Sequence, residues 1–164
     1  MITIREAVKA DITEILECRH QAIYTKAVQH YSAHELEEWV GKTVGSKQAA
    51  YEKSISDPEI IFQVAEDENG KIIGFGNIII PDNEFKNLYS SVLGRKVGVM
   101  LMQRLENQAK QRGVKFLTLR SSLNAYEFYL SQGYVSEGRI MFKMPSGLDI
   151  ECVNMRKIIM QSYT

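Results

Sequence analysis

A short basic segment that contains two glycines is the part of this sequence best suited to hold an anion. It reads Gly94-Arg95-Lys96-Val97-Gly98 and lies between a predicted strand and a predicted helix. At such a junction unpaired backbone N–H groups and the helix dipole attract phosphate, glycine allows positive φ, and the two basic side chains add positive charge. An ordinary strand-to-helix turn with solvated basic residues would have the same composition. The segment therefore predicts either a phosphate-binding loop or a plain turn, and its surroundings must decide.

The loop differs from two common nucleotide-binding signatures. It lacks G-x-x-x-x-G-K-S/T, the loop whose lysine and hydroxyl reach the phosphates of a nucleoside triphosphate. It is also not G-x-G-x-x-G followed about 20 positions later by an acidic residue at the end of a second parallel strand. A nucleotide triphosphatase and a dinucleotide enzyme are therefore disfavoured.

Cysteines and histidines offer two further chemistries. Cys18 would be a nucleophile only if His20 activated it, and residues two apart on a predicted helix face different directions. His30 and His34 have the i, i+4 spacing of a metal pair, but a predicted helix cap at Ser32 separates them, and no carboxylate-rich second pair is evident. The sequence thus favours neither a covalent cysteine mechanism nor a metal site.

The chain before the loop predicts a strand, three helices and then three strands. Asp11 is suited to cap the first helix, and Ser32 with Glu35 forms a capping-box pattern for the second, which Gly41 ends. Asn69-Gly70 is the signature of a tight hairpin between two antiparallel strands. The expected segments are a strand at 2–7, helices at 12–28, 33–40 and 47–55, and strands at 60–65, 71–80 and 84–90.

After the loop, apolar residues at helical spacing predict a helix from Val97 that Gly113 ends in a left-handed cap. A strand at 115–120, a helix at 122–132 closed by Gly133, and strands at 134–142 and 149–157 are expected to follow. Early helices followed by β-β-β-α-β-α-β-β predict an α/β protein with a mixed sheet covered by helices.

Composition limits the class of protein further. A chain of 164 residues with 45% hydrophobic content can bury one substantial core, so a single domain over 1–164 is expected. Lys+Arg and Asp+Glu are both 20, so no net charge steers the protein toward nucleic acid or an anionic membrane. The start of the sequence lacks a secretory signal pattern, and the two cysteines form no disulfide framework. These features predict a cytoplasmic protein without a nucleic-acid or membrane partner.

Two segments resemble the two signatures of the GNAT superfamily of N-acetyltransferases, and they follow each other in the same order as in that superfamily. Leu88-Tyr89, the glycine loop and Leu101 look like its acetyl-CoA motif, with Leu93 at the usual Gln/Arg position and Lys96 at that of the middle glycine. Residues 124–134, Asn-Ala-Tyr-Glu-Phe-Tyr-Leu-Ser-Gln-Gly-Tyr, resemble its second signature. The resemblance implies a GNAT-like acyl-CoA N-acyltransferase fold, with a mostly antiparallel central sheet, a splayed fourth and fifth strand pair, and flanking helices.

The same resemblance implies acetyl-CoA as co-substrate and no metal. Backbone groups at the end of the fourth strand would pair with the pantetheine arm, and backbone N–H groups of the loop would meet the pyrophosphate. Asn124 either caps its helix or contacts the cofactor arm. The expected cofactor-binding residues are Leu88, Tyr89, Ser90, Gly94, Arg95, Lys96, Val97, Gly98, Val99 and Asn124.

Acetyl transfer to an amine poses two proton problems, because the amine must be neutral when it attacks and the departing thiolate must gain a proton. By its position in the matched signature, Tyr129 is the candidate general acid, since a phenol with a pKa of about 10 stays protonated at neutral pH. Without the motif, Tyr129 would be interpreted as a core aromatic of an amphipathic helix. Glu84, at the start of the fourth strand, is the candidate base, acting directly or through water.

The resemblance places the acceptor pocket among the early helices, with Tyr24, His30, Tyr31 and Trp39 as its expected lining. Aromatic lining suits a small molecule or peptide that carries an amine. The hypotheses are therefore an acetyl-CoA-dependent N-acetyltransferase, a non-catalytic acyl-CoA-binding module of the same fold, and a structural domain without CoA affinity. A homodimer is compatible with all three.

Overall fold

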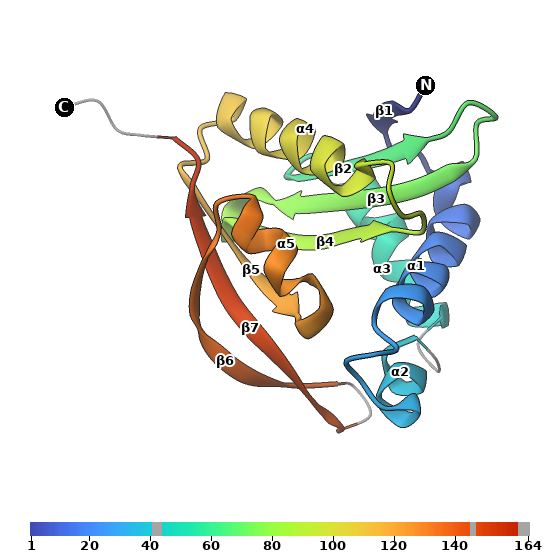
Figure 1. Ribbon diagram of the computed structural model, residues 1–164. Helices are drawn as coiled ribbons and strands as arrows, with labels where there is room; N and C mark the ends of the chain where they lie inside the picture. Colours follow the sequence, from blue (N-terminus) through green and yellow to red (C-terminus); the bar gives the residue numbers. More distant parts are fainter. Residues whose placement is uncertain (41–43, 145–146, 161–164) are drawn as a thin grey trace.

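A seven-stranded sheet with the order β1-β2-β3-β4-β5-β7-β6 forms the centre of the molecule (Figure 1). The computed structural model describes residues 1–40, 44–144 and 147–160, so the expected helix end at Gly41 lies outside the described residues. The strands are β1 Thr3–Glu6, β2 Ile60–Glu66, β3 Ile72–Ile79, β4 Glu84–Ser90, β5 Phe116–Ser122, β6 Val135–Lys143 and β7 Asp149–Ile158. The predicted mixed sheet is confirmed, and the expected strands match these within a few residues.

The first four strands form an antiparallel meander. The turn between β2 and β3 has Gly70 at φ 78°, as the Asn-Gly signature predicts, and Asp67 accepts hydrogen bonds from the N–H groups of Asn69 and Lys71. Between β3 and β4 the register shifts after Asn77, which leaves Lys86 as an extra residue in β4. This bulge lies in the strand that the sequence assigns to the cofactor site.

β4 and β5 diverge. They pair in parallel at one position, Glu84 with Thr118, and beyond it no register pair joins the two strands within the described chain. The N–H of Thr118 donates to the carbonyl of Asn83 at 2.8 Å, which fixes the closed end of the splay. Because β5 pairs with β7 along its whole length, the sheet divides into two halves that separate toward Ser90. The splayed fourth and fifth strand pair is thus confirmed.

Helices cover both faces of the sheet. Figure 1 shows α4 and α5 in front of it and α1 and α3 behind it. The helices are α1 Ile12–Lys26, α2 Ala33–Val40, α3 Val44–Ser56, α4 Val97–Gln111 and α5 Tyr126–Ser131. The α4 side encloses one apolar cluster that includes Leu101, Leu105 and Tyr129, and the α1–α3 side encloses another around Phe62 and Phe75.

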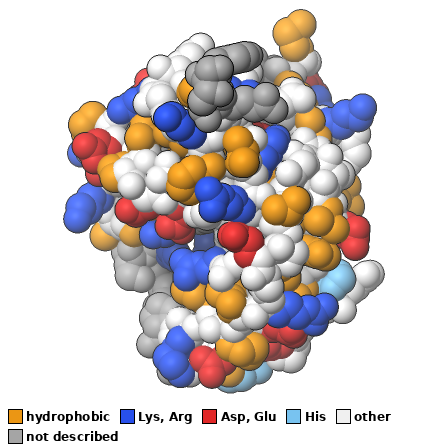
Figure 2. All heavy atoms as spheres, turned by 90° about the vertical axis from the view of Figure 1, so that its left-hand side faces the viewer, with side chains coloured by type: hydrophobic (Ala, Val, Ile, Leu, Met, Phe, Trp, Pro, Cys, Tyr) orange, Lys and Arg blue, Asp and Glu red, His pale blue; other side chains and the backbone are white. Residues whose placement is uncertain are grey.

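The β6–β7 hairpin forms the outer edge of the C-terminal half of the sheet. Figure 2 looks onto this side of the molecule, where apolar, basic and acidic side chains are interspersed. Arg139 pairs with Glu151 across the hairpin at 2.8 Å, and Val135 and Met141 on β6 are exposed. This face carries no patch of one charge sign among the described residues.

Two expected helix starts differ from the structure. Asp11 does not cap α1, because its carboxylate accepts hydrogen bonds from Arg5 at 2.8 and 2.9 Å and from the N–H of Val8 at 2.8 Å. The helix expected at 122–132 begins with a 3-10 turn, Leu123–Ala125, and becomes α-helical only at Tyr126. The capping box of α2 is confirmed, since Ser32 and Glu35 exchange hydrogen bonds of 2.9 and 3.1 Å.

Candidate active site

A cavity of about 660 Å³ opens where β4 and β5 separate. Its walls come from the end of α1, the second half of β4, the loop before α4, and the segment from β5 into α5. Segments far apart in the sequence meet here because the splay leaves no strand between β4 and β5 (Figure 1). The cavity therefore brings together the glycine loop and the tyrosine-bearing helix that the sequence singles out.

The glycine loop ends in a helix start whose N–H groups are free to bind an anion. The first backbone bond of α4 runs from the N–H of Met100 to the carbonyl of Lys96 at 3.1 Å, so the amides of Val97, Gly98 and Val99 have no partner inside the helix. No side chain caps this end, and all three residues line the cavity. This arrangement suits a phosphate group.

Lys96 occupies a left-handed conformation, with φ 56° and ψ 30°, immediately before α4. A left-handed backbone conformation strains a residue that has a Cβ atom, whereas glycine adopts it without that strain. The position where the motif usually has glycine therefore keeps the conformation that favours glycine.

Replacing Lys96 by glycine is expected to raise the free energy of unfolding by about 1 kcal/mol, since the relief of left-handed strain exceeds the entropy that glycine adds to the unfolded chain. Urea denaturation measures this change. Lys110→Gly in the last turn of α4 is the control, and it should lower stability by about 1 kcal/mol because that residue is right-handed helical. A Lys96→Gly protein that is less stable than wild type would contradict the strain argument.

The side chain of Arg95 turns away from the cavity. Its guanidinium donates to Glu68 at 2.9 Å in the turn between β2 and β3 and does not line the cavity. The proposal that its backbone N–H meets pyrophosphate stays a prediction, whereas Lys96 does line the cavity. Lys96 is therefore the basic residue of the loop whose side chain is available to the cavity.

The second half of β4 forms one wall of the cavity. Leu88, Tyr89 and Ser90 line it, and beyond Glu84 no strand of the described chain pairs with their β5-facing edge. The ring of Tyr89 stacks on Phe75 with centroids 5.3 Å apart, which fixes the strand end against the sheet. Unpaired edge groups of this kind can receive an extended, amide-containing chain.

Asn124 faces the cavity with an unused hydrogen-bond acceptor. It lies in the 3-10 turn, so the expectation that it caps α5 is wrong: Ala125 is the capping position and no side chain caps it. The Oδ1 atom of Asn124 is buried and has no hydrogen-bond partner among the described residues. A buried acceptor without a partner is costly unless a ligand supplies a donor. This atom is available to accept a hydrogen bond from a ligand in the cavity.

Tyr129 combines a core position with access to the cavity. Its side chain is 8% exposed and packs in edge contact against Phe128 and Tyr134, with centroids 5.4 and 5.9 Å away. It also lines the cavity, and no hydrogen bond joins its hydroxyl to another described residue. Burial is the larger cause that raises the pKa of Tyr129 above its ordinary value, and the nearby Tyr89 raises it further. The phenol is thus held neutral beside the splay.

Glu84 lies at the closed end of the splay and does not line the cavity. Its carboxylate is 3.8 Å from the guanidinium of Arg120, a residue that does line the cavity. Glu84 therefore stands one side chain away from the cavity wall, and its assignment as the base stays a prediction.

The structure separates the four expected acceptor residues. Trp39 lines the cavity, whereas Tyr24 and His30 are exposed and do not. The hydroxyl of Tyr31 donates to the carbonyl of Glu151 at 2.9 Å and accepts from the N–H of Leu123 at 2.9 Å. With 7% exposure, Tyr31 ties the connection between α1 and α2 to β7 and to the start of the 3-10 turn.

Sequence reasoning missed several residues that line the cavity, above all Lys86, Arg120 and Phe128. The sequence carries one signal of the bulge at Lys86: the apolar residues Phe85 and Leu88 are three apart in a strand, and in the structure both pack on the α4 side. That spacing breaks the period of two and indicates an extra residue between them.

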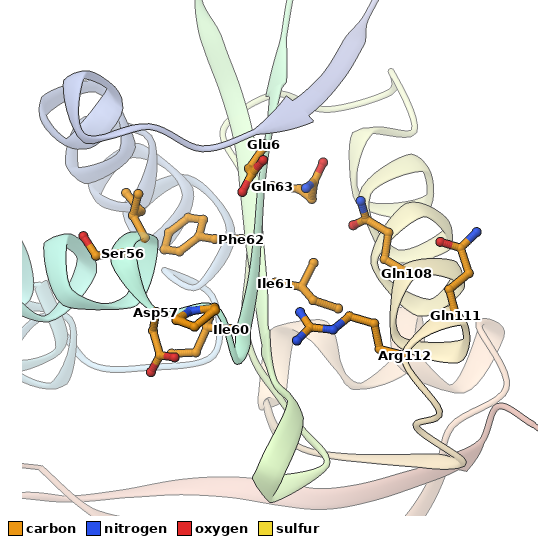
Figure 3. A pocket seen from close by; sticks show the side chains of 12 residues that line it. Glu6, Ser56, Asp57, Ile60, Ile61, Phe62, Gln63, Gln108, Gln111 and Arg112 are labelled. Atoms are coloured by element: carbon orange, nitrogen blue, oxygen red, sulfur yellow. The ribbon is translucent and has the colours of Figure 1, made fainter.

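A second cavity of about 430 Å³ lies between the ends of α3 and α4 (Figure 3). Gln63 and Gln108 point toward each other on the α4 side of β2, with Glu6 and Arg112 near them, whereas Ser56 and Asp57 lie on the α3 side of the strand (Figure 3). It contains neither the glycine loop nor Tyr129, and none of its lining residues is a cysteine or histidine. The chemistry predicted from the sequence therefore belongs to the first cavity.

Within the described ranges, no group of three or more His, Cys, Asp or Glu side chains is arranged to hold a metal ion. In the same part of the chain, none of the helices has the length and apolar character needed to cross a membrane.

Comparison with known proteins gives one family and a consistent fold. The sequence model of the acetyltransferase (GNAT) domain matches residues 27–158. A solved GCN5-related N-acetyltransferase from Rhodopseudomonas palustris is 26% identical, covers 95% of this chain and 94% of its own, and superposes with a TM-score of 0.84.

Two further structures share the fold and contain the cofactor. The PaiA N-acetyltransferase from Thermoplasma acidophilum, in complex with coenzyme A, is 21% identical with a TM-score of 0.76, covering 96% of this chain and 99% of its own. A phosphinothricin acetyltransferase from Sinorhizobium meliloti, in complex with AcCoA, is 17% identical with a TM-score of 0.73. The match covers 96% of this chain and 88% of that protein.

The splayed strand pair and the helix start beside it define an acyl-CoA N-acyltransferase fold. The chain belongs to the GNAT acetyltransferase domain family and is an acyl-CoA-dependent acetyltransferase.

Proposed function

We propose that this protein transfers an acetyl group from acetyl-CoA to the primary amine of a small molecule or peptide by direct attack. The observation that carries the proposal is the single cavity in which the free amides of Val97 to Val99, the unpaired edge of β4 and the hydroxyl of Tyr129 meet. The amides hold the pyrophosphate, the β4 edge holds the pantetheine arm, and Asn124 accepts from one of its amide groups.

The protein must then manage two protons. The amine nitrogen forms a bond to the carbonyl carbon as the carbon–sulfur bond breaks, so one proton leaves the amine and one reaches the thiolate. Tyr129, neutral and facing the cavity, donates to the sulfur. Glu84 receives the amine proton through water, because the carboxylate lies beyond the cavity wall beside Arg120.

The proposal is tested by titrating the protein with acetyl-CoA in a calorimeter and then measuring free thiol release with a panel of primary amines. We expect saturable binding and acceptor-dependent thiol release. Absence of acetyl-CoA binding would refute the proposed function. Binding without release on any amine would instead support the acyl-CoA-binding module, the alternative that shares this fold.

A further inference from the structure

The cavity has a second concentration of positive charge away from the pyrophosphate loop. Its lining, all from described residues, contains four basic side chains, Lys26, Lys86, Lys96 and Arg120, and no Asp or Glu. Lys96 lies at the loop, but Lys86 is four residues before Ser90 on β4, about 13 Å along the strand. Coenzyme A carries its anionic groups only at the nucleotide end, and its pantetheine arm is neutral. The charge at Lys86 and Arg120 therefore faces the acceptor.

A buried guanidinium lies directly behind this wall. Arg19 on α1 is 5% exposed, donates to the carbonyl of Trp39 at 2.8 Å, and lies 5.9 Å from the centre of the Tyr89 ring. Its Nε has no hydrogen-bond partner in the described chain. Trp39 and Tyr89 both line the cavity, so Arg19 contacts two residues of its wall.

Lys47 on α3 adds to the same group. The pKa of Lys47 is lowered to about 8. Burial is the largest cause, and the positive charges of Arg19 and Lys86 lower it further. Lys47 thus feels the positive charge of both Arg19 and Lys86, and among described residues none of the three forms an ion pair. The residues outside the described ranges contain no Asp or Glu that could compensate them.

Arg120 already has Glu84 3.8 Å away, whereas Arg19, Lys47 and Lys86 have no acidic partner among the described residues. Positive charge at or beside a low-dielectric wall is unfavourable unless an anion completes it. We propose that the acyl acceptor is a primary amine that also carries an anionic group, a carboxylate, which Lys86 and Arg120 bind directly and Arg19 stabilises from behind Tyr89 and Trp39. This inference rests on the proposed function and adds the substrate class. The same charges disfavour a protonated amine near them and repel a polyamine.

The test compares four primary alkyl amines that differ in the charge of the far end. These are 4-aminobutyrate, O-phosphoethanolamine, butylamine and putrescine. Thiol release from acetyl-CoA should be at least about tenfold faster, as kcat/KM, with 4-aminobutyrate than with butylamine, and slowest with putrescine, since a charge-assisted hydrogen bond is lost or replaced by repulsion. If O-phosphoethanolamine exceeds 4-aminobutyrate by a similar factor, the site selects phosphate and the carboxylate assignment is wrong.

Calorimetric titration of the acetyl-CoA-saturated protein with the same amines measures the preference without turnover. Tighter binding of 4-aminobutyrate than of butylamine supports the inference. Equal binding, preference for butylamine or putrescine, or no binding of any amine overturns it. These outcomes are distinct from failure of the proposed function, which is loss of acetyl-CoA binding itself.

Charge substitutions at Lys86 locate the effect. Lys86→Gln should reduce the preference for 4-aminobutyrate over butylamine about tenfold, and Lys86→Glu should reverse the order so that putrescine becomes the best acceptor. Lys86 is exposed, so both variants should fold and bind acetyl-CoA as the wild type does. Lys53→Glu, an exposed lysine on α3, is the matched control and should leave the preference unchanged. An unchanged preference in Lys86→Glu would refute the assignment.

Discussion

Tyr129→Phe should lower kcat for acetyl transfer about 100-fold and leave the affinity for acetyl-CoA unchanged, since loss of a general acid typically costs two to four orders of magnitude. The substitution removes only a hydroxyl that makes no hydrogen bond to another described residue. The ring keeps its edge contacts with Phe128 and Tyr134, so the fold should not change. Steady-state kinetics and acetyl-CoA titration separate the two effects.

The matched control is Tyr134→Phe. Tyr134 touches the Tyr129 ring and is 1% exposed, but it does not line the cavity, and its own hydroxyl is buried without a partner in the described chain. Removing that hydroxyl should therefore be neutral or slightly stabilising and should leave kcat near the wild-type value. Equal loss of activity in both variants would indicate a packing effect instead of proton donation.

The pH profile provides a second measurement of the same assignment. Because burial raises the pKa of Tyr129, its hydroxyl stays protonated through neutral and mildly alkaline pH. Ionisation of Tyr129 should therefore cause no decline in the wild-type rate below about pH 10. Over that range, wild type and Tyr129→Phe should show the same pH dependence. A decline between pH 7 and 9 that disappears in Tyr129→Phe would mean that the tyrosine ionises there and does not act as the neutral donor.

Much of this architecture follows from local sequence signals. Alternating apolar residues, the Asn69-Gly70 turn and the Ser32–Glu35 box predict elements whose structure depends mainly on neighbouring residues. The glycine loop and Tyr129 are also local, and both line the cavity where the sequence order places them, except that Arg95 turns toward Glu68. That exception depends on a hairpin 27 positions earlier in the chain, which no local pattern reveals.

The acceptor side of the cavity is harder to predict because distant segments build it. The family resemblance predicts Tyr31 as a lining residue, but hydrogen bonds to Glu151 and Leu123, 120 and 92 positions away, fix it as a structural link. Arg19 gives the opposite case, because only its contacts with Trp39 and Tyr89 show that a helix residue contributes charge to the cavity wall. Long-range packing, not periodicity, determines both roles.

Gly76→Ala should lower the free energy of unfolding by about 2–3 kcal/mol, because a Cβ at this position has no room. It would lie 2.8 Å from a methyl group of Leu105 on α4 and 2.9 Å from the backbone carbonyl of Asn87 on β4. The methyl group can move, but the carbonyl belongs to the strand beside the bulge and cannot move without disturbing the register of Leu88, the partner of Gly76. Thermal denaturation should show a loss of roughly 5–10 °C in Tm.

The same substitution at Gly98 gives the control, with the opposite sign. Its Cβ would approach only the ring edge of Phe128, at 3.3 Å, and the position is in the first turn of α4, where alanine is the better helix former by about 1 kcal/mol. Gly98→Ala should therefore be neutral or stabilising. Gly76→Ala should also weaken acetyl-CoA binding, because the strand it displaces carries Leu88, Tyr89 and Ser90 along the cavity wall. If Gly76→Ala unfolds at the wild-type temperature, the close contact between α4 and the meander is not what positions β4.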